Sequence, residues 1–309
     1  MTDINLERFD SALYALPYGV ANLLRSLPSK IKSQVQEIRL RADKPLTLTI
    51  GARVAFVDKN GCVSFIKTNN LFLVTPNDIV NTVKNLCNNS MYSHTEEIKQ
   101  GFIAMRHGHR AGVAGNFSGE SVYDFSSVNI RIARQIFGAA DFLYERYSSG
   151  GVLIAGPPGS GKTTVLRDFI RQLSDGKSGK YRRVAVVDTR GEISACHGGK
   201  IQNDLGDNTD VLYGIEKARG VEIALRTLGP DIIAFDEIGT EAELGAVAQC
   251  MGGGADVVLT AHIGKLSELA TRSITRKLLT QNNVKLVAML SCEKSPEIYS
   301  RREIERCLF

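Results

Sequence analysis

The sequence predicts an α/β protein in which a parallel sheet occupies the second half and a smaller α+β domain precedes it. In the second half, continuous apolar runs recur between helical stretches, which is the pattern of a parallel sheet covered on both faces. In the first half, apolar and polar residues alternate over short segments, as in strands with one buried face. The run Tyr147-Ser148-Ser149-Gly150-Gly151 has the small residues of a joint, so we place the domains at 1–146 and 147–309.

The composition is that of an ordinary globular chain. The 309 residues are 43% hydrophobic and 23% charged, which excludes wholesale disorder and a coiled-coil rod. The net charge of +5 comes without a sharp basic cluster, so we expect no nucleic-acid partner. The six cysteines form no CxxC pair, which favours reduced thiols. The sequence lacks a membrane-spanning apolar run and a signal-peptide pattern, so we expect a cytoplasmic protein.

The elements of the first half are predicted from periodicity and from turn and cap residues. Residues 5–28 have the leucine spacing of helices, and Pro17 marks the boundary between two short ones. Residues 35–66 alternate as strands, with a tight turn at Asn60-Gly61. Thr75-Pro76 supplies the N-cap and the first residue of a helix that has apolar residues on one face over 79–86. The remaining predictions are hairpin strands at 54–57 and 63–66, a helix at 95–99, and strands at 102–106 and 110–114.

The elements of the second half begin with an apolar strand at 152–155. A glycine loop follows, and then a helix with apolar residues on one face over 165–173. Residues 266–278 have near-helical apolar spacing, which predicts core packing with a solvated basic face. Further buried strands are predicted at 184–187, 232–235, 257–259 and 284–290.

The glycine loop matches the phosphate-binding pattern GxxxxGK[ST] at every position. It follows a strand and opens a helix, which is the context that this motif requires. Glycines allow backbone N–H groups to approach phosphate oxygens, and the helix N-terminus adds a partial positive charge. We expect the loop to bind ATP and Mg²⁺, with Lys162 on the β- and γ-phosphates and the Thr163 hydroxyl on the metal. The nucleotide-binding residues are predicted to be Gly156, Pro157, Pro158, Gly159, Ser160, Gly161, Lys162, Thr163, Thr164 and Asp236.

Acidic residues follow two of the other predicted strands. Asp236-Glu237 ends the strand at 232–235, and we expect Asp236 to hold Mg²⁺ and Glu237 to activate the attacking water. Glu192 follows the strand at 184–187 and is a second candidate for water activation. Thr260 or His262, at the end of another strand, is a candidate sensor of the γ-phosphate.

Arginines precede the nucleotide-binding half. Arg106, Arg110, Arg131 and Arg134 are candidates for a finger that neutralises transition-state charge, supplied by the first domain or by a neighbouring chain. A basic face in contact with solvent explains any one of them equally well.

The ordered set of motifs resembles the type II/type IV secretion ATPase superfamily. The set comprises the P-loop, Asp188-Thr189-x-x-Glu192, the segment Leu225–Ile233 with Asp236-Glu237, and Thr260-Ala261-His262. Two further segments, 37–42 and 129–134, resemble a stage III sporulation family within that superfamily, so the resemblance spans nearly the whole chain.

The resemblance implies a RecA-like ATPase core behind a smaller N-terminal domain, in a homohexameric ring with ATP near the subunit interfaces. It also implies a motor that energises a membrane-bound secretion or sporulation channel from the cytoplasmic side, with channel proteins of the same operon as partners. Carried over, Lys162, Glu192 and Glu237 are catalytic candidates, His262 couples the nucleotide state to motion, and Arg131 and Arg134 match an arginine-bearing segment. The sequence departs from the superfamily at Asp236-Glu237, where Gly-Glu is common, so the division of labour between Glu192 and Glu237 stays open.

Two alternatives remain. A RecA-like core also suits a motor stimulated by nucleic acid, and a nucleotide-dependent scaffold with little turnover would need the same loop.

Overall fold

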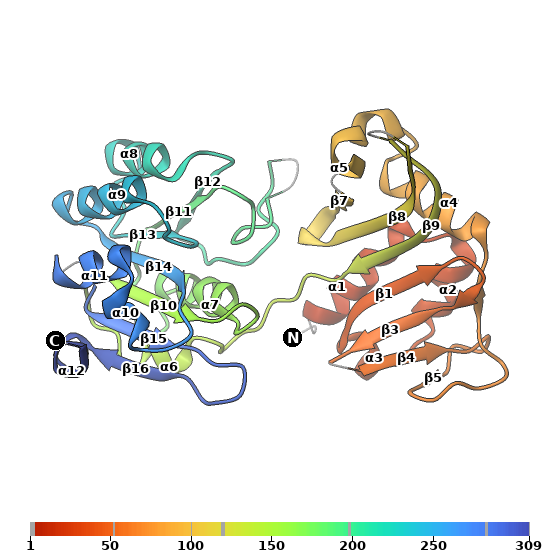
Figure 1. The fold of residues 1–309 in the computed structure, drawn as a ribbon, viewed down its shortest axis with the longest axis horizontal. Coiled ribbons are helices and arrows are strands. Elements are labelled where there is room, and N and C mark those ends of the chain that lie inside the picture. Colours follow the sequence, from red (N-terminus) through yellow and green to blue (C-terminus); the bar gives the residue numbers. More distant parts are fainter. Residues whose placement is uncertain are drawn as a thin grey trace. The chain divides into compact units, whose positions relative to one another are not determined.

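The computed structural model of the chain describes residues 4–51, 53–99, 101–118, 121–196, 199–281 and 284–308. The chain divides into two compact units, Met1–Gln135 and Ile136–Phe309 (Figure 1). The predicted boundary at residues 146–147 therefore moves to Gln135–Ile136, because the segment that follows packs with the second unit. Within the described ranges, none of the helices has both the length and the apolar character needed to cross a bilayer.

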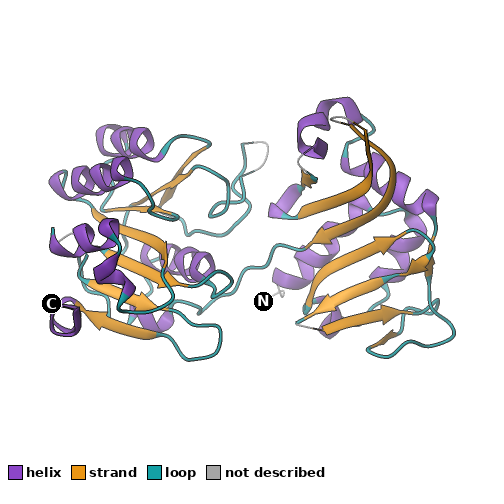
Figure 2. Cartoon of the chain, viewed as in Figure 1, coloured by secondary structure: helices purple, strands orange, loops and turns teal. Residues whose placement is uncertain are grey.

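The first unit is an antiparallel sheet with helices on one face (Figure 2). In the described part of the chain its strand order is β5-β4-β3-β1-β9-β8-β7, and β2 pairs separately with β6. The helices are α1 (Ile4–Ala12), α2 (Tyr18–Arg25), α3 (Ser29–Lys32), α4 (Pro76–Leu86) and α5 (Thr95–Lys99). The strands are β1 (Val35–Arg41), β2 (Lys44–Pro45), β3 (Thr47–Ile50), β4 (Arg53–Val57), β5 (Val63–Ser64), β6 (Leu73–Val74), β7 (Phe102–Ala104), β8 (Arg110–Ser118) and β9 (Ser121–Arg131).

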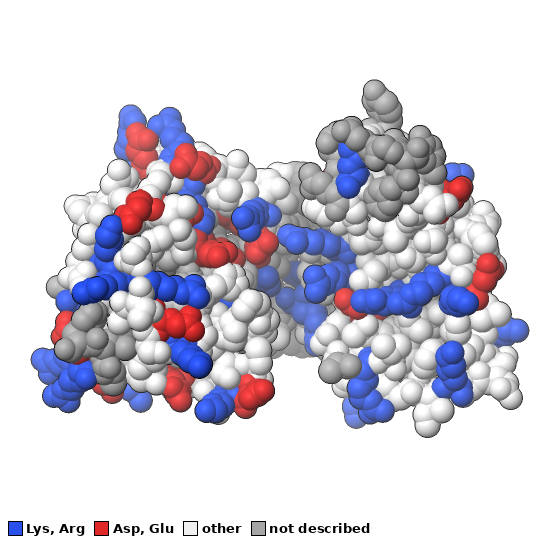
Figure 3. Space-filling view, viewed as in Figure 1, with Lys and Arg blue, Asp and Glu red and all other residues white. Residues whose placement is uncertain are grey.

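Successive side chains of the strands point to opposite faces of the sheet, so one face packs in the core and the other carries charged residues. Ile38 is paired with Leu48 on β3 and with Ile130 on β9, and all three are buried against the helices. After the register shift between Val35 and Glu37, the odd positions of β1 point the other way, so Glu37 and Arg39 form an ion pair of 2.9 Å on the opposite face. Lys and Arg side chains form a row across this unit in the view of Figure 3.

Most predicted elements of this unit are confirmed. The Thr75 hydroxyl accepts a hydrogen bond from the Asp78 N–H, and the Asp78 carboxylate accepts from the Thr75 N–H, which makes the capping box that starts α4. The sequence did not predict β9. Serine and asparagine on its exposed face conceal its alternation, and its pairing with β1 and β8 defines it as a strand.

His109 joins α1 to the end of β9 through a fully buried imidazole. Its Nδ1 atom accepts a hydrogen bond from the Ala133 N–H at 2.9 Å, so Nε2 carries the proton and faces the Ser11 hydroxyl at 2.9 Å. Burial, together with the nearby positive charge of Arg8, lowers the pKa of His109 to about 3. The imidazole therefore stays neutral in the folded protein at pH values where it is protonated in the unfolded chain.

We expect the first unit to lose stability as the pH falls below the unfolded-chain pKa of histidine. The unfolded state binds the proton between about pH 6.5 and 3 and the folded state does not, so at pH 5 His109 alone lowers the free energy of unfolding by about 2 kcal/mol relative to pH 8. Urea unfolding at both pH values measures this effect. A His109→Asn variant should be less stable at pH 8 yet lose less stability on acidification, and an unchanged pH slope would contradict the assignment.

The second unit is a sheet with helices on both faces (Figure 1). Among the described residues the strand order is β12-β11-β13-β14-β10-β15-β16, with every pair parallel except β15 and β16. The strands are β10 (Val152–Gly156), β11 (Val184–Asp188), β12 (Thr209–Tyr213), β13 (Ile232–Phe235), β14 (Asp256–His262), β15 (Leu286–Met289) and β16 (Glu297–Ser300). The helices are α6 (Asp141–Tyr144), α7 (Lys162–Ser174), α8 (Lys217–Thr227), α9 (Glu241–Gly252), α10 (Glu268–Thr271), α11 (Ser273–Thr280) and α12 (Arg301–Leu308).

The two faces of this sheet have separate cores. Val152 and Ile154 of β10 pack with α6 and α7, whereas Leu153 and Ala155 pack on the side of α8, α9 and α11. The α/β class with a parallel sheet, preceded by a smaller α+β domain, is thus confirmed. The edge strands β12 and β16 were not predicted, because their half-exposed residues lack the continuous apolar run of a central strand.

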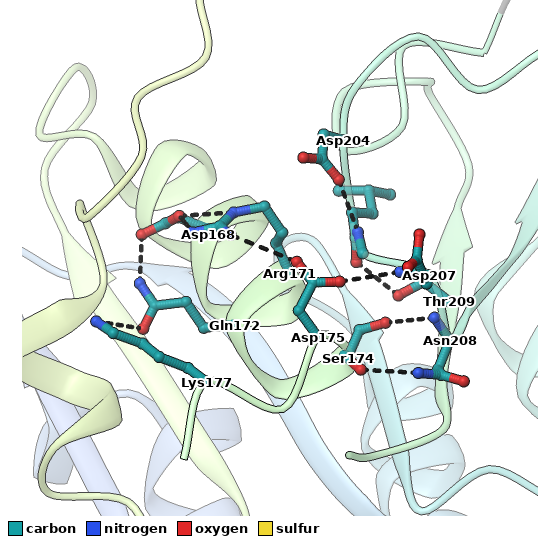
Figure 4. A network of polar contacts seen from close by, with 12 residues as sticks. Asp168, Arg171, Gln172, Ser174, Asp175, Lys177, Asp204, Asp207, Asn208 and Thr209 are labelled. Atoms are coloured by element: carbon teal, nitrogen blue, oxygen red, sulfur yellow. Dashed lines mark hydrogen bonds and ion pairs between the residues drawn. The ribbon is translucent and has the colours of Figure 1, made fainter. Parts of the chain in front are cut away.

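The buried Asp168 carboxylate of α7 is hydrogen-bonded within its own helix (Figure 4) and also to the start of the second unit. Asp168 accepts hydrogen bonds from the Ala140 N–H at 2.9 Å, from Gln172 at 2.7 Å and from Arg171 at 2.8 Å. At the C-terminal end of α7, the Ser174 hydroxyl accepts from the Asn208 N–H at 2.7 Å, just before β12. The helix that follows the glycine loop is therefore held at its middle and at its C-terminal end, and the segment from residue 136 belongs with it.

Candidate nucleotide site

The glycine loop lies between β10 and α7, at the carboxyl ends of the parallel strands. Gly159 and Gly161 have φ angles of +76° and +89°, which place the loop in a left-handed conformation that glycine adopts at little cost. Gly156 is tightly packed, because a Cβ atom there would lie 2.9 Å from the Leu290 carbonyl oxygen. The helix α7 begins at Lys162, with Thr163 and Thr164 in its first turn.

Lys162 is held inside the curve of the loop and is only 7% exposed. Its ammonium donates to the carbonyl oxygens of Gly156 at 3.0 Å and Pro157 at 2.9 Å, and lies 3.1 Å from Nδ1 of His262. An ammonium only donates, so Nδ1 accepts and the His262 proton resides on Nε2. Burial lowers the pKa of Lys162, and the carboxylates of Asp236 and Glu237 oppose that shift.

Asp236 connects the loop to the neighbouring strands. Its Oδ2 atom accepts a hydrogen bond from the Thr163 hydroxyl at 3.3 Å, and Oδ1 accepts from the fully buried Thr260 hydroxyl. The Thr260 hydroxyl also accepts from the Glu237 N–H at 2.9 Å. The hydroxyl of Thr260, a candidate phosphate sensor, thus points to Asp236 and orients it.

Glu237 has a left-handed backbone, with φ at +36°, although it is not a glycine. Its side chain is 47% exposed, and Oε2 lies 3.6 Å from Nε2 of His262. The His262 carbonyl in turn accepts a hydrogen bond from Arg272 at 2.6 Å. Lys162, His262 and Glu237 therefore form a continuous polar row from the loop to the acidic strand end.

The loop after β11 is organised by a buried aspartate. Asp188 accepts from the Glu192 N–H at 3.0 Å and from the Ser194 N–H at 2.7 Å. The Glu192 carbonyl accepts from Nε of Arg167 at 3.2 Å. Burial lowers the pKa of Arg167, while the negative charges of Asp236, Asp188 and Glu192 act in the opposite direction. Arg167 on α7 is thus the cation shared by both acidic strand ends.

A cavity of about 350 Å³ opens between these acidic segments. Glu192 and Glu237, the two candidates for water activation, both line it, together with Asp188, Asp236, Lys217 and Glu243.

Arg131 and Arg134 belong to the first unit. They line a separate cavity of about 290 Å³ with Arg110 and Glu37. Arg131 is 71% exposed and lies 3.8 Å from a Glu37 carboxylate oxygen, and Arg134 donates to the Ser33 carbonyl at 2.9 Å. Both arginines therefore line a cavity formed by residues of the first unit.

Sequence reasoning missed Arg167 and Lys217 as site residues. Arg167 follows Thr163 by four positions, so the helical period places both on the same face of α7, and this spacing was a signal that could have found it. Lys217 had no such signal, because it follows a loop and meets Glu237 only in the folded chain.

The residues present fit a magnesium nucleotide. Two oxygen ligands of an octahedral Mg²⁺ ion lie about 2.9 Å apart, and the oxygens of Thr163 and Asp236 are separated by 3.3 Å. The Lys162 ammonium, now bound to loop carbonyls, has the three donors needed to exchange them for phosphate oxygens. Such an ion, when bound, neutralises phosphate charge and polarises the terminal phosphoryl group.

Three comparisons with known proteins identify the family and the fold of this chain. The family described as "Sporulation stage III, protein AA" matches residues 11–305. Stage III sporulation protein AA of Bacillus subtilis (strain 168) is 32% identical over 296 residues, which cover 93% of this chain and 92% of that protein. Among solved structures, the Legionella pneumophila ATPase DotB has a TM-score of 0.55 at 16% identity, covering 82% of this chain and 72% of DotB. The pilus retraction motor PilT with bound ADP has a TM-score of 0.56 at 16% identity, covering 88% of this chain and 82% of PilT. The chain therefore has a RecA-like fold, which it shares with DotB and PilT.

Proposed function

This chain belongs to the sporulation stage III, protein AA family, and from that premise we propose that it is a Mg²⁺-dependent ATPase that drives a membrane-bound sporulation or secretion channel complex. One observation supports the ATPase most directly. The Thr163 hydroxyl of the phosphate-binding loop contacts Asp236 at the end of β13, so the two oxygens suited to Mg²⁺ share one site with Lys162.

Hydrolysis needs a group that activates water opposite the terminal phosphate. We assign this role to Glu237, with Glu192 as the alternative. Glu237 directly follows Asp236, the proposed Mg²⁺ ligand, and its partly exposed side chain lines the cavity between the acidic segments. His262 bridges Lys162 and Glu237, so a phosphate that draws Lys162 away from His262 also changes what Glu237 faces. In this way the nucleotide state changes the contacts of His262, the last residue of β14.

The motor is proposed to be a homohexameric ring on the cytoplasmic side of the membrane, with channel proteins of the same operon as partners and no nucleic-acid substrate. DotB is an ATPase and PilT is a pilus retraction motor, and the shared fold is compatible with a related task. The Arg131 side chain is 71% exposed, and we carry Arg131 and Arg134 forward as the candidates for a finger that neutralises charge on a terminal phosphate.

The decisive experiment measures ATPase rate against oligomer size by analytical ultracentrifugation, with and without ATP. We expect the rate per chain to rise with the fraction of oligomer. Arg131→Ala and Arg134→Ala should lower that rate and leave ATP binding intact, because they act on the transition state. A rate independent of oligomer size would contradict the ring. Stimulation by added DNA or RNA would instead favour a nucleic-acid motor, and binding with only a single turnover would favour a scaffold.

A further inference from the structure

Lys217 contacts the turn after β13 from a position where a lysine is unfavourable. It is the first residue of α8, where the helix dipole repels a cation. Its ammonium nevertheless donates to the Glu237 carbonyl and forms an ion pair of 2.7 Å with Oε1 of Glu243. Both side chains are only 17% exposed. The contact with the turn, rather than the local preference of the helix, accounts for a lysine at this position.

Glu243 links this lysine to the far end of the same turn. Its Oε2 atom accepts hydrogen bonds from the Gly239 N–H at 2.8 Å and the Thr240 N–H at 2.9 Å. Burial by itself raises the pKa of Glu243, but the hydrogen bonds from Lys217 and from these two amides outweigh it and lower the pKa below its usual value. The carboxylate is therefore ionised at neutral pH and remains paired with Lys217.

The turn between these contacts contains the strained residue. Glu237 has its φ at +36°, a conformation that persists only where neighbouring groups hold it. Its N–H is bound on one side by the Asp236 carboxylate at 3.0 Å and the Thr260 hydroxyl at 2.9 Å. Its carbonyl is bound on the other side by Lys217. The peptide that carries this carbonyl is also held at its other end, where the Ile238 N–H donates to the Thr260 carbonyl at 3.0 Å. Lys217 is therefore the side chain that holds the carbonyl side of Glu237, and its loss leaves the restraints on the two N–H groups.

We propose that Lys217, braced by Glu243, is a positioning residue that keeps Glu237 in its left-handed conformation and thereby aims the Glu237 carboxylate into the acidic cavity. This inference rests on the proposed ATPase function and adds a residue to its machinery. Lys217 acts through the Glu237 backbone, so it should affect the rate of the chemical step more than the binding of ATP.

The test compares Lys217→Met, Lys217→Arg and Glu243→Gln with a matched control. Lys277→Met is that control, because Lys277 also pairs with a glutamate of α9, Glu241 at 2.8 Å, but does so at the surface. We expect Lys217→Met to lower kcat by ~10- to 100-fold with KM changed less than about threefold, since small misplacements of a catalytic group have effects of this size. Lys217→Arg should recover much of the loss because it can still donate to the carbonyl. Glu243→Gln should fall between them, and Lys277→Met should match the wild type.

Hydrogen exchange of the nucleotide-free protein provides a second readout that needs no turnover. The amides of Glu237 and Ile238 should exchange faster in Lys217→Met than in the wild type and in Lys277→Met. Unchanged exchange and a wild-type kcat in Lys217→Met would overturn the proposal, as would a loss confined to KM. A wild-type protein without ATPase activity would refute the proposed function instead, and the exchange result would still decide whether Lys217 holds the turn.

Discussion

Lys162→Ala is expected to reduce ATP turnover by at least ~10²-fold, the scale on which removal of one preorganised charge-stabilising donor acts. The Lys162 ammonium donates to the carbonyls of Gly156 and Pro157 and lies beside His262, so it is already held within the glycine loop. Alanine removes both the positive charge and the donors. We therefore also expect weaker ATP binding, which fluorescence titration with a labelled nucleotide measures alongside steady-state hydrolysis.

Lys180→Ala is the matched control for this prediction, because Lys180 is an exposed lysine of the same unit. It should leave turnover and ATP binding at wild-type values. Circular dichroism and thermal unfolding would show whether Lys162→Ala retains the fold. A folded Lys162→Ala protein that hydrolyses ATP at the normal rate would contradict both the assignment of the loop and the ATPase proposal.

Glu237→Gln is expected to lower kcat by ~10²- to 10⁴-fold, the range that positioned acid–base groups contribute. Glutamine preserves the size of the side chain but removes the charge that orients and deprotonates water. Nucleotide affinity should stay near the wild-type value, because Lys162 and the Thr163–Asp236 pair are untouched. Single-turnover and steady-state assays, run beside binding measurements, separate these effects.

Glu192→Gln decides between the two acidic candidates. Glu192 is joined to Arg167 and Asp188 through its backbone, so its side chain can change without disturbing those hydrogen bonds. We expect Glu192→Gln to lower kcat less than Glu237→Gln does. The reverse order would assign water activation to Glu192 and would leave Glu237 with a role beside His262.

Local patterns in the sequence identified most elements of both units. The parallel sheet was predictable because its central strands are buried on both faces and therefore contain continuous apolar residues. The hairpin turn at Asn60-Gly61 and the cap at Thr75 were predictable because their signals lie within a few residues. The strands β9, β12 and β16 were not, because pairing with neighbours rather than their own composition defines them.

The candidate site also has features that local sequence predicts and features that only tertiary contacts define. By itself, the sequence determined the glycine loop, the acidic strand ends and their order, because a glycine loop between a strand and a helix is a local pattern with one structural outcome. The tertiary structure alone decided that Thr260 orients Asp236, that Arg167 joins two acidic segments, and that Lys217 holds the carbonyl of Glu237. These contacts join residues far apart along the chain, and only the register of the parallel strands brings their carboxyl ends to one edge of the sheet.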